Sequence, residues 1–278
     1  MRTSSIDSCR KKSETDTKEN ESKRRNSCSS TGRIAVVGIG PGGLEHMTLK
    51  AKQEIENAEV IIGYKTYLKL IRQIIKNDVE VISGNMGQEV DRARTAIQKA
   101  NENKLVVVVS SGDSGVYGMA GVVLETAEYE KANITIEVVP GVTAATAAAA
   151  TLGAPLVGDF AAISLSDILT PWSLIERRLR AAAESDFAIV LYNPQSKGRR
   201  KPLAKAHKIL LEYRDPKTHV GIVKKAKRDG EKATITSLKE MLNFEIDMAT
   251  VVVIGNSKTY KINNKLVTPR GYSFKSKQ

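Results

Sequence analysis

The sequence has few of the residues that carry metal or covalent chemistry. It contains two cysteines, three histidines and one tryptophan in 278 residues. Both cysteines, Cys9 and Cys28, lie within the first 31 residues. The rest of the chain therefore has no disulfide and no cysteine metal ligand, which fits a reducing cytosol. We expect a cytoplasmic protein without a bound metal ion, because two isolated thiols rarely make a metal site.

Long apolar runs are also absent. No stretch reaches the roughly 18 apolar residues that a membrane-spanning helix needs, so we expect no membrane association. The first residues lack the apolar core of a secretory signal. Residues 1–31 are polar, charged and rich in serine. Such a segment cannot bury enough surface to offset the entropy of ordering, and we predict a disordered leader.

Positive charge is abundant but unevenly placed. The net charge is +12, of which residues 1–31 carry +3 and residues 197–232 carry +9. The remainder is balanced. A local excess of positive charge favours a polyanionic partner, either nucleic acid or a small molecule with several carboxylates. A solvated helix face would give the same charge pattern.

The most informative stretch is residues 105–121. Its first five residues, 105–109, are an apolar run too short for a buried helix, and its valines suit a strand covered on both faces. The run ends in small residues around Asp113, and Ser114 is placed to cap a helix over residues 119–129. A strand that ends in a small acidic loop before a helix is typical of a ligand site in an open α/β sheet. A tight turn capped by Asp113 is the alternative.

Apolar runs and amphipathic segments alternate along the rest of the chain. This order predicts the α/β class, with parallel strands covered by helices on both sides. A small-residue linker at residues 153–158 divides the chain into an N-terminal α/β domain, 32–155, and a C-terminal α/β domain, 156–278. The expected helices lie at residues 44–58, 66–75, 88–100, 119–129, 142–151, 172–184, 202–213 and 237–242.

The first glycine-rich loop does not fit a dinucleotide. Gly38, Gly40 and Gly43 satisfy G-x-G-x-x-G after a predicted strand. The next strand, residues 59–63, ends without the carboxylate that holds a ribose hydroxyl, and Pro41 has no N–H for a phosphate. A non-catalytic nucleotide-binding module is therefore disfavoured, and the loop is interpreted as the backbone rim of another site.

Several separate tracts together resemble one family, the tetrapyrrole methyltransferases. VGIGPGGLEHMTLKA, SSGDSGVYGMAG and VVPGVTAATAAAATLGAP are similar to the family in general. GYKTY, SDILTPW, YNPQSKGR and TPRGY resemble the branch of cobalamin synthesis that methylates carbon 17 and contracts the ring. The resemblance covers residues 32–272. Gly43 and Ser114 depart from the common pattern, which has Asp and Pro there.

This resemblance implies a homodimer with S-adenosylmethionine bound in a cleft between two domains, and precorrin-3B or cobalt-factor III as the substrate. The first tracts look more like the cobalt-early route. The implied cofactor contacts are Pro41, Gly112, Asp113, Val116, Tyr117, Thr143, Ala144, Tyr192, Asn193, Val223 and Gly255, with the last four at cleft-lining strand ends.

The chemistry implied by the family places few demands on protein side chains. The nucleophile would be a ring carbon of the substrate, which explains the absence of a Ser-His-Asp or Cys-His arrangement. Ring contraction needs proton transfers, and His46 beside the glycine loop is the first candidate, with a surface histidine as the alternative. Lys197, Arg199, Arg200 and Lys201 offer cations to the carboxylates of the substrate.

A second hypothesis is an RNA methyltransferase of the same fold that binds RNA through residues 197–232. RNA recognition by stacking requires exposed aromatic residues among the cations. The segment offers only Tyr213. We therefore rank this hypothesis below the tetrapyrrole hypothesis and expect no nucleic-acid partner.

Overall fold

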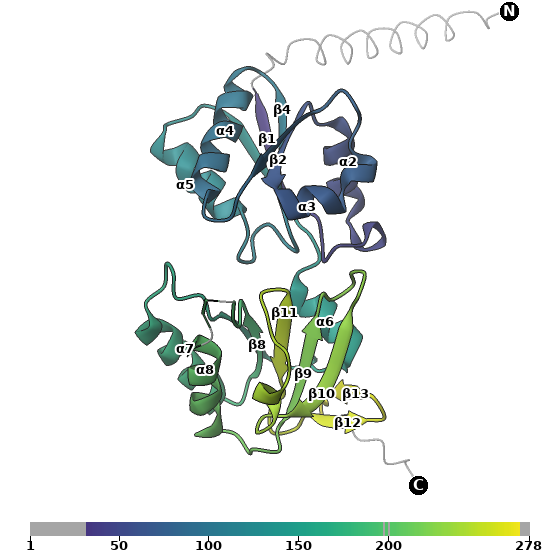
Figure 1. Cartoon of the computed structure of the whole chain (residues 1–278), viewed down its shortest axis with the longest axis vertical. Coiled ribbons are helices and arrows are strands. Elements are labelled where there is room, and N and C mark those ends of the chain that lie inside the picture. Colours follow the sequence, from purple (N-terminus) through teal and green to yellow (C-terminus); the bar gives the residue numbers. More distant parts are fainter. Residues whose placement is uncertain (1–31, 197, 200, 273–278) are drawn as a thin grey trace, which may run out of the picture.

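The computed structural model describes residues 32–272 except 197 and 200. It contains two α/β domains stacked end to end, each built on its own five-stranded sheet (Figure 1). The α/β class predicted from the sequence is confirmed. The predicted disorder of residues 1–31 and the two cysteines lie outside the described residues.

The first sheet is entirely parallel, in the order β3-β2-β4-β1-β5. The central strands are rich in valine and isoleucine, as expected for a sheet buried on both faces. The predicted central run forms β4 beside β1. The strands are β1 (Arg33–Gly38), β2 (Val60–Tyr64), β3 (Glu80–Gly84), β4 (Leu105–Ser110) and β5 (Thr135–Val139).

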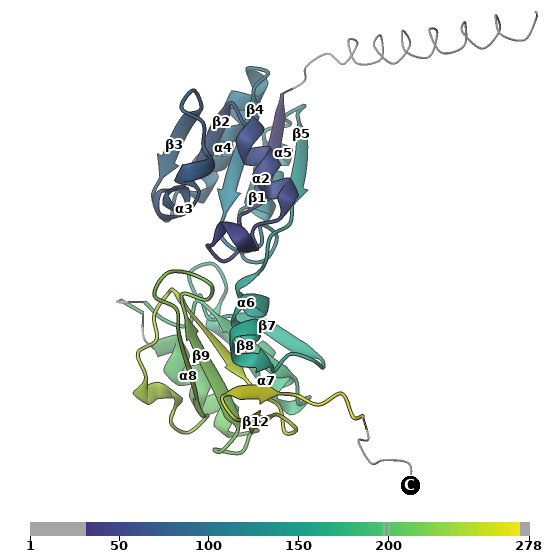
Figure 2. The ribbon, with the colours of Figure 1, turned by 90° about the vertical axis from the view of Figure 1, so that its right-hand side faces the viewer.

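Alternate residues of these strands pack into two separate cores. Val36 and Val108 face α4 (Glu89–Asn101) and α5 (Ala120–Tyr129). Val37 and Val109 face the opposite layer, formed by α2 (Leu49–Asn57) and α3 (Lys65–Leu70) with the single turn η2 (Arg72–Ile74). Figure 1 shows the strands between α4 and α5 on one side and α2 and α3 on the other, and Figure 2, turned by 90°, shows the strands spread across the view from β3 to β5. The period of two along each strand places helices on both faces.

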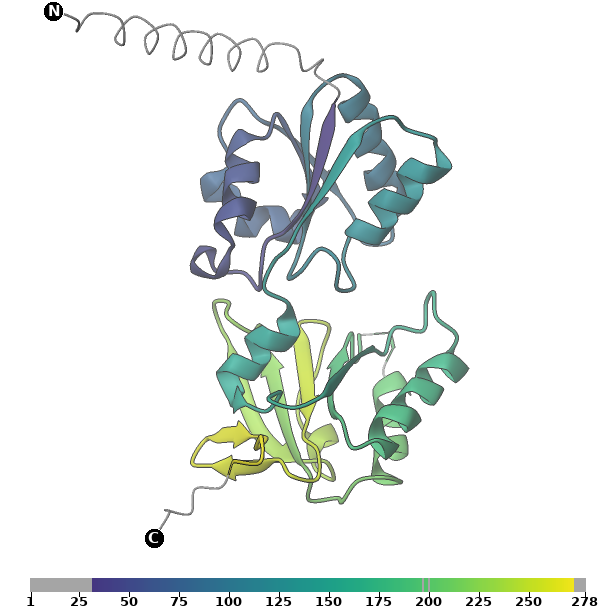
Figure 3. The same ribbon diagram turned by 180° about the vertical axis from the view of Figure 1, so that it is seen from behind.

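The chain passes from one sheet to the other immediately after β5. Residues 140–143 lead into α6 (Ala144–Leu152), which packs on the second sheet through Ala145 and Ala148 (Figure 3). A Cβ added at Gly221 would lie 2.3 Å from the Leu152 side chain, so helix and sheet are in close contact. By packing, α6 joins the second domain, although the division at residue 155 assigned it to the first.

The second sheet is mixed, in the order β10-β9-β11-β8-β7. Only β7 and β8 are parallel to each other, and β11 runs antiparallel to both of its neighbours. Helices α7 (Trp172–Glu184) and α8 (Lys201–Leu211) cover the face opposite α6. The strands are β7 (Phe160–Ser164), β8 (Ala188–Tyr192), β9 (His219–Lys224), β10 (Lys232–Ser237) and β11 (Thr250–Ile254).

A small third sheet closes the end of the second domain. Its strands are β6 (Gly153–Ala154), β12 (Tyr260–Ile262) and β13 (Lys265–Val267). Part of the predicted linker is thus a strand, and β13 was not predicted. Among the described residues no helix is long and apolar enough to cross a membrane.

Several local predictions differ from the structure. The predicted helix over residues 44–58 is divided into the short turn η1 (Leu44–His46) and α2, because the Thr48 side chain accepts the N–H of Ala51 and starts a new helix. The predicted helix over residues 237–242 is reduced to the turn η3 (Met241–Asn243).

A further difference concerns Ser114. It does not cap α5, whose N-cap is Met119 without a side-chain hydrogen bond. The Ser114 hydroxyl instead donates to the carbonyl of Val139 at 3.1 Å. This bond ties the loop after β4 to the end of β5, so Ser114 acts between strands rather than at a helix end.

Candidate functional site

A cavity of 140 Å³ lies between the two domains. It is at the carboxyl ends of β1 and β4 in the first domain, where open parallel sheets bind ligands. From the second domain it meets the end of β8 and the start of β11. The lining residues are Pro41, Tyr67, Ser111, Gly112, Ala144, Tyr192, Asn193, Lys225, Ala226, Arg228, Met248, Ala249, Thr250 and Val251.

Backbone segments form the upper wall of the cavity. Gly40 and Gly112 exchange two hydrogen bonds, of 2.9 and 2.8 Å, and both have positive φ angles, of 71° and 67°. Glycine adopts this conformation without steric cost. A Cβ added at Gly141 would lie 2.2 Å from the carbonyl oxygen of Gly112. The glycines therefore allow three loops to meet where a ligand would contact main chain.

Asp113 fixes this junction. One carboxylate oxygen accepts the N–H of Gly115 at 2.8 Å, and the other accepts the N–H of Gly141 at 2.9 Å. The tight turn considered as the alternative is thus present. Asp113 is partly exposed beside the cavity but is not among its lining residues. In the structure its carboxylate organises the loops that form the wall.

Two tyrosines connect the domains. Tyr117, on the loop after β4, donates its hydroxyl to the carbonyl of Ala162 at 2.9 Å and accepts the N–H of Ser164 at 3.1 Å. Its ring lies 5.0 Å from that of Tyr192 between centroids. Burial raises the pKa of both phenols. Both therefore remain neutral hydrogen-bonding groups at physiological pH.

Tyr192 also anchors the start of α6. Its hydroxyl lies 2.6 Å from that of Thr143 and accepts the N–H of Ala145 at 2.8 Å. A helix leaves its first N–H groups without internal partners. The Tyr192 side chain supplies an acceptor at the point where the chain enters the second domain.

The structure brings together most of the predicted cofactor contacts. Five of them line the cavity: Pro41, Gly112, Ala144, Tyr192 and Asn193. Asp113, Tyr117 and Thr143 contact the same loops. Val116 is 37% exposed on the loop after β4. Val223 is fully buried, and its backbone pairs with the lining residue Val251.

The prediction that Gly255 lines the cleft is wrong. It follows β11, which runs antiparallel to β8 and β9, so Ile254 pairs with Ile189 and Val220 near the amino ends of those strands. The N–H of Gly255 donates to the carbonyl of His219 at that far edge. The cavity instead meets the start of β11. The alternation of helices and strands in the sequence suggested parallel pairing and gave no sign of this reversal.

His46 lies in η1 next to the glycine loop but does not line the cavity. Its Nε2 is 3.7 Å from a carboxylate oxygen of Glu45, and 37% of its side chain is exposed. This environment resembles that of a surface histidine more than that of an enclosed acid or base. Its role in proton transfer stays a prediction.

The predicted substrate cations are only partly described. Lys197 and Arg200 lie outside the described residues. Arg199 donates to the carbonyls of Leu165 and Asn193 and pairs with Asp167 at 3.3 Å. It therefore holds the loop after β8 against the loop after β7. Lys201 is exposed at the first position of α8.

Nine of the lining residues were not selected from the sequence, and three of them carry polar side chains of interest. Tyr67, Ser111 and Arg228 all face the cavity. Arg228 lies in the basic turn after β9. Because several lysines surround it in the sequence, composition alone does not distinguish it from its neighbours. Ser111 directly precedes Gly112, which was a predicted cofactor contact, and this adjacency could have identified it.

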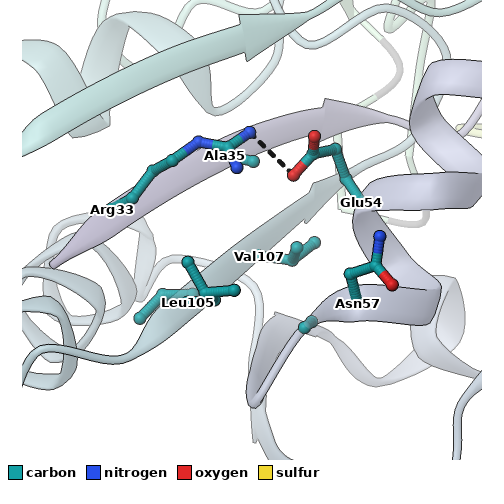
Figure 4. A pocket seen from close by; sticks show the side chains of 8 residues that line it. Arg33, Ala35, Glu54, Asn57, Leu105 and Val107 are labelled. Carbon is teal, nitrogen blue, oxygen red and sulfur yellow. Dashed lines mark ion pairs between the residues drawn. The ribbon is translucent and has the colours of Figure 1, made fainter. Parts of the chain in front are cut away.

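A second hollow, of 410 Å³, lies at the opposite end of the first sheet, at the start of β1 and β4. Figure 4 shows Arg33 and Glu54 pointing toward each other across it, and their side chains pair at 2.8 Å. Ligands of open α/β sheets bind at the carboxyl ends of strands. We assign this hollow a structural role. Among the described residues no cluster of three or more His, Cys, Asp or Glu side chains could hold a metal ion.

Comparison with known proteins gives a consistent result. The model of the "Tetrapyrrole (Corrin/Porphyrin) Methylases" family matches residues 33–242. The chain is 48% identical over 248 residues to the "Cobalt-factor III methyltransferase" of Priestia megaterium, covering 88% of this chain and 46% of that protein. It thus spans about half the length of that relative. It is 44% identical over 240 residues to the "Probable cobalt-factor III C(17)-methyltransferase" of Salmonella typhimurium, covering 86% of this chain and 99% of that protein.

Solved structures agree with this assignment. The methyltransferase CobJ superposes with a TM-score of 0.80 at 37% identity and covers 86% of this chain and 100% of its own. A uroporphyrin-III C-methyltransferase from Thermus thermophilus, complexed with S-adenosylhomocysteine, superposes with a TM-score of 0.62 at 27% identity. That match covers 81% of this chain and 97% of its own. The family match, the high identity and the two-domain fold all lead to one conclusion: the chain belongs to the tetrapyrrole (corrin/porphyrin) methylase family.

Proposed function

We propose that the chain is an S-adenosylmethionine-dependent methyltransferase of cobalamin biosynthesis that methylates carbon 17 of cobalt-factor III and contracts its ring. The observation that carries this proposal is the identity of 44–48% to cobalt-factor III methyltransferases, which extends over 86–88% of the chain and so through both domains. The cobalt ion in this account is part of the substrate. The names of these relatives favour the cobalt-loaded substrate over precorrin-3B.

The interdomain cavity is the proposed site of the methyl donor. Its wall combines aromatic and aliphatic groups with polar ones, including Asn193, Lys225 and Arg228, which suits an adenosine with an amino-acid tail. Its volume of 140 Å³ is below the roughly 300–1,000 Å³ of ordinary small-molecule sites. The chemistry of the lining fits the donor, and the cavity widens when the donor binds.

The proposed donor contacts are the lining residues Pro41, Gly112, Ala144, Tyr192 and Asn193, with Asp113, Val116, Tyr117, Thr143 and Val223 around them. Bound S-adenosylmethionine supplies an electrophilic methyl group on a sulfonium. The protein aligns that group with a ring carbon and keeps water out. The hydrogen-bonded glycine loops and the buried Tyr192 suit this task, because contacts within the protein hold each of them in place.

The proposal also covers substrate binding, proton transfer and the state of the protein in the cell. Arg199, Lys201 and their neighbours Lys197 and Arg200 are proposed to attract the carboxylates of the macrocycle. His46 is the proposed group for proton transfer during ring contraction. A cytoplasmic homodimer is the proposed state in the cell, following the family resemblance. The RNA hypothesis has no support from the relatives, and the hydroxyl of Tyr213, its one aromatic residue, lies 3.5 Å from Arg180.

The test is mass spectrometry of products. The purified chain is incubated with cobalt-factor III, or with metal-free precorrin-3B, and a donor that carries a deuterated methyl group. The proposal predicts transfer of one labelled methyl group to the cobalt-loaded macrocycle. Transfer to the metal-free macrocycle alone would reassign the substrate. Labelling of neither, with active uroporphyrin-III C-methyltransferase as the positive control, would contradict the proposed activity.

A further inference from the structure

Arg228 extends from the second domain into the first. It lies on the loop of residues 225–231 between β9 and β10. Its Nε donates to the carbonyl of Pro41, and its Nη2 donates to the hydroxyl of Ser111 at 2.7 Å. A Cβ added at Gly42 would lie 2.4 Å from Cγ of Arg228. The glycine loop is therefore shaped around this side chain.

The guanidinium is partly buried without an opposite charge. Both of its hydrogen-bond partners are neutral oxygens, and among the residues that the structure describes Arg228 forms no ion pair. Burial lowers its pKa. A cation removed from water without an anion is costly. Such a group, facing a cavity, is suited to an anionic ligand.

The backbone that carries Arg228 is held in place. The N–H of Lys225 donates to the carbonyl of Ala249 at 2.8 Å, and the N–H of Arg228 donates to the carbonyl of Lys225 at 2.9 Å. The carboxylate of Glu231, at the end of the loop, accepts the hydroxyl of Thr151 in α6 at 3.0 Å. The side chain can therefore change its partners while its attachment point stays fixed.

The small size of the cavity favours such a change. Arg228 crosses the space between the domains and lines a cavity of only 140 Å³. A ligand as large as S-adenosylmethionine would compete with Pro41 and Ser111 for the space around the guanidinium. The freed donors then require new acceptors in the same cleft, and a carboxylate provides two in the planar geometry that a guanidinium prefers.

We propose that Arg228 binds a carboxylate of the ligand when the interdomain cleft fills, exchanging Pro41 and Ser111 for the two carboxylate oxygens. This inference rests on the proposed function. The carboxylate belongs either to the amino-acid tail of the methyl donor or to an acetate or propionate chain of the macrocycle. Both sources present the same chemistry to the guanidinium, and the experiment separates them.

The experiment is a calorimetric titration of the full chain with two nucleosides. S-adenosylhomocysteine carries the amino-acid carboxylate, and 5′-methylthioadenosine lacks it. The proteins are the wild type, Arg228→Gln, Arg228→Lys and the control Lys239→Gln, which removes an exposed cation of the same domain. Cobalt-factor III is then titrated at saturating S-adenosylhomocysteine, followed by absorbance. Unfolding curves establish that each variant is folded.

Two results support the inference. If the donor provides the carboxylate, Arg228→Gln weakens S-adenosylhomocysteine binding about 10- to 100-fold and leaves 5′-methylthioadenosine binding unchanged. If the macrocycle provides it, both nucleosides bind as in the wild type and cobalt-factor III binding weakens by a similar factor. Arg228→Lys keeps the positive charge but loses the planar pair of N–H donors, so its affinity for the same ligand should lie between those of the wild type and Arg228→Gln.

Two results overturn it. Equal weakening of both nucleosides would show that Arg228 merely holds the domains together, and unchanged binding of all three ligands would remove any role in recognition. If Arg228→Gln does not fold, the Arg228→Lys titrations decide by the same comparison. Failure of the wild type to bind either nucleoside would instead contradict the proposed function, so the two failures are distinct.

Discussion

The hydroxyl oxygens of Tyr192 in β8 and Thr143 at the start of α6 lie 2.6 Å apart, at the point where the chain passes between the domains. The same tyrosine oxygen accepts the N–H of Ala145. Since Tyr192 also lines the cavity, one side chain serves both the domain junction and the proposed donor site.

Tyr192→Phe tests this double role. The substitution removes an acceptor from the buried Ala145 N–H, and we expect a loss of about 1–3 kcal/mol in the free energy of unfolding. Binding of S-adenosylhomocysteine should weaken as well. Urea titration gives the first value and calorimetry the second. Tyr213→Phe is the matched control, because its hydroxyl makes only a 3.5 Å contact at the surface, and it should change neither quantity measurably.

Gly141→Ala tests the close approach of the loops. The added methyl group would lie 2.2 Å from the carbonyl oxygen of Gly112 and 2.6 Å from that of Gly38, and backbone atoms cannot move aside cheaply. We expect a loss of about 2–3 kcal/mol in stability.

The control for this substitution is Gly121→Ala. Gly121 lies in α5 with no atom within 4 Å of an added Cβ. Alanine is the better helix former, so this variant should be neutral or up to about 1 kcal/mol more stable. A Gly141→Ala protein as stable as the wild type would refute the backbone packing described for the cavity wall.

Glu54→Gln tests the ion cluster of the hollow in Figure 4. Burial opposes ionisation of Glu54, but hydrogen bonds from Lys50 and Arg33 outweigh it and keep its pKa below the usual value. The carboxylate therefore stabilises the fold above pH about 4.3, the pKa of an unfolded glutamate, and that contribution is lost as the pH falls through the lower folded pKa. We expect Glu54→Gln to cost about 1–2 kcal/mol at pH 7.

The pH dependence of stability distinguishes a contribution from the charge of Glu54 from one that comes from packing. The difference in unfolding free energy between wild type and Glu54→Gln should be constant near neutral pH and shrink below pH about 4. Glu56→Gln, more exposed on the same helix, is the control with little effect. A difference for Glu54→Gln that persists unchanged at low pH would mean that packing, not charge, carries the contribution.

Much of the fold could be predicted because the local patterns were unambiguous. The helix over residues 172–184 and the strand at residues 250–254 have the predicted bounds. The first segment has the amphipathic period of a helix, and the second is a run of β-branched residues typical of a buried strand. The predicted central strand and its glycine loop were confirmed in position.

The failures have equally specific causes. The small side chains of the alanine-rich α6 suit packing against either sheet, so its composition did not reveal that it packs on the second one. The antiparallel direction of β11 depends on pairing with distant strands, which moved Gly255 away from the cavity. Arg228 is one of seven lysines and arginines between residues 214 and 232, and nothing in the local sequence distinguishes it from the other six. Its importance comes from contacts with Pro41 and Ser111, far away in the sequence.

The most direct test of the central claim is a crystal structure of the chain with S-adenosylhomocysteine. The account predicts that the ligand lies between the domains against Gly112, Tyr192 and Asn193, in a cleft wider than the present 140 Å³. A ligand found elsewhere, for example in the hollow beside Arg33 and Glu54, would contradict the account.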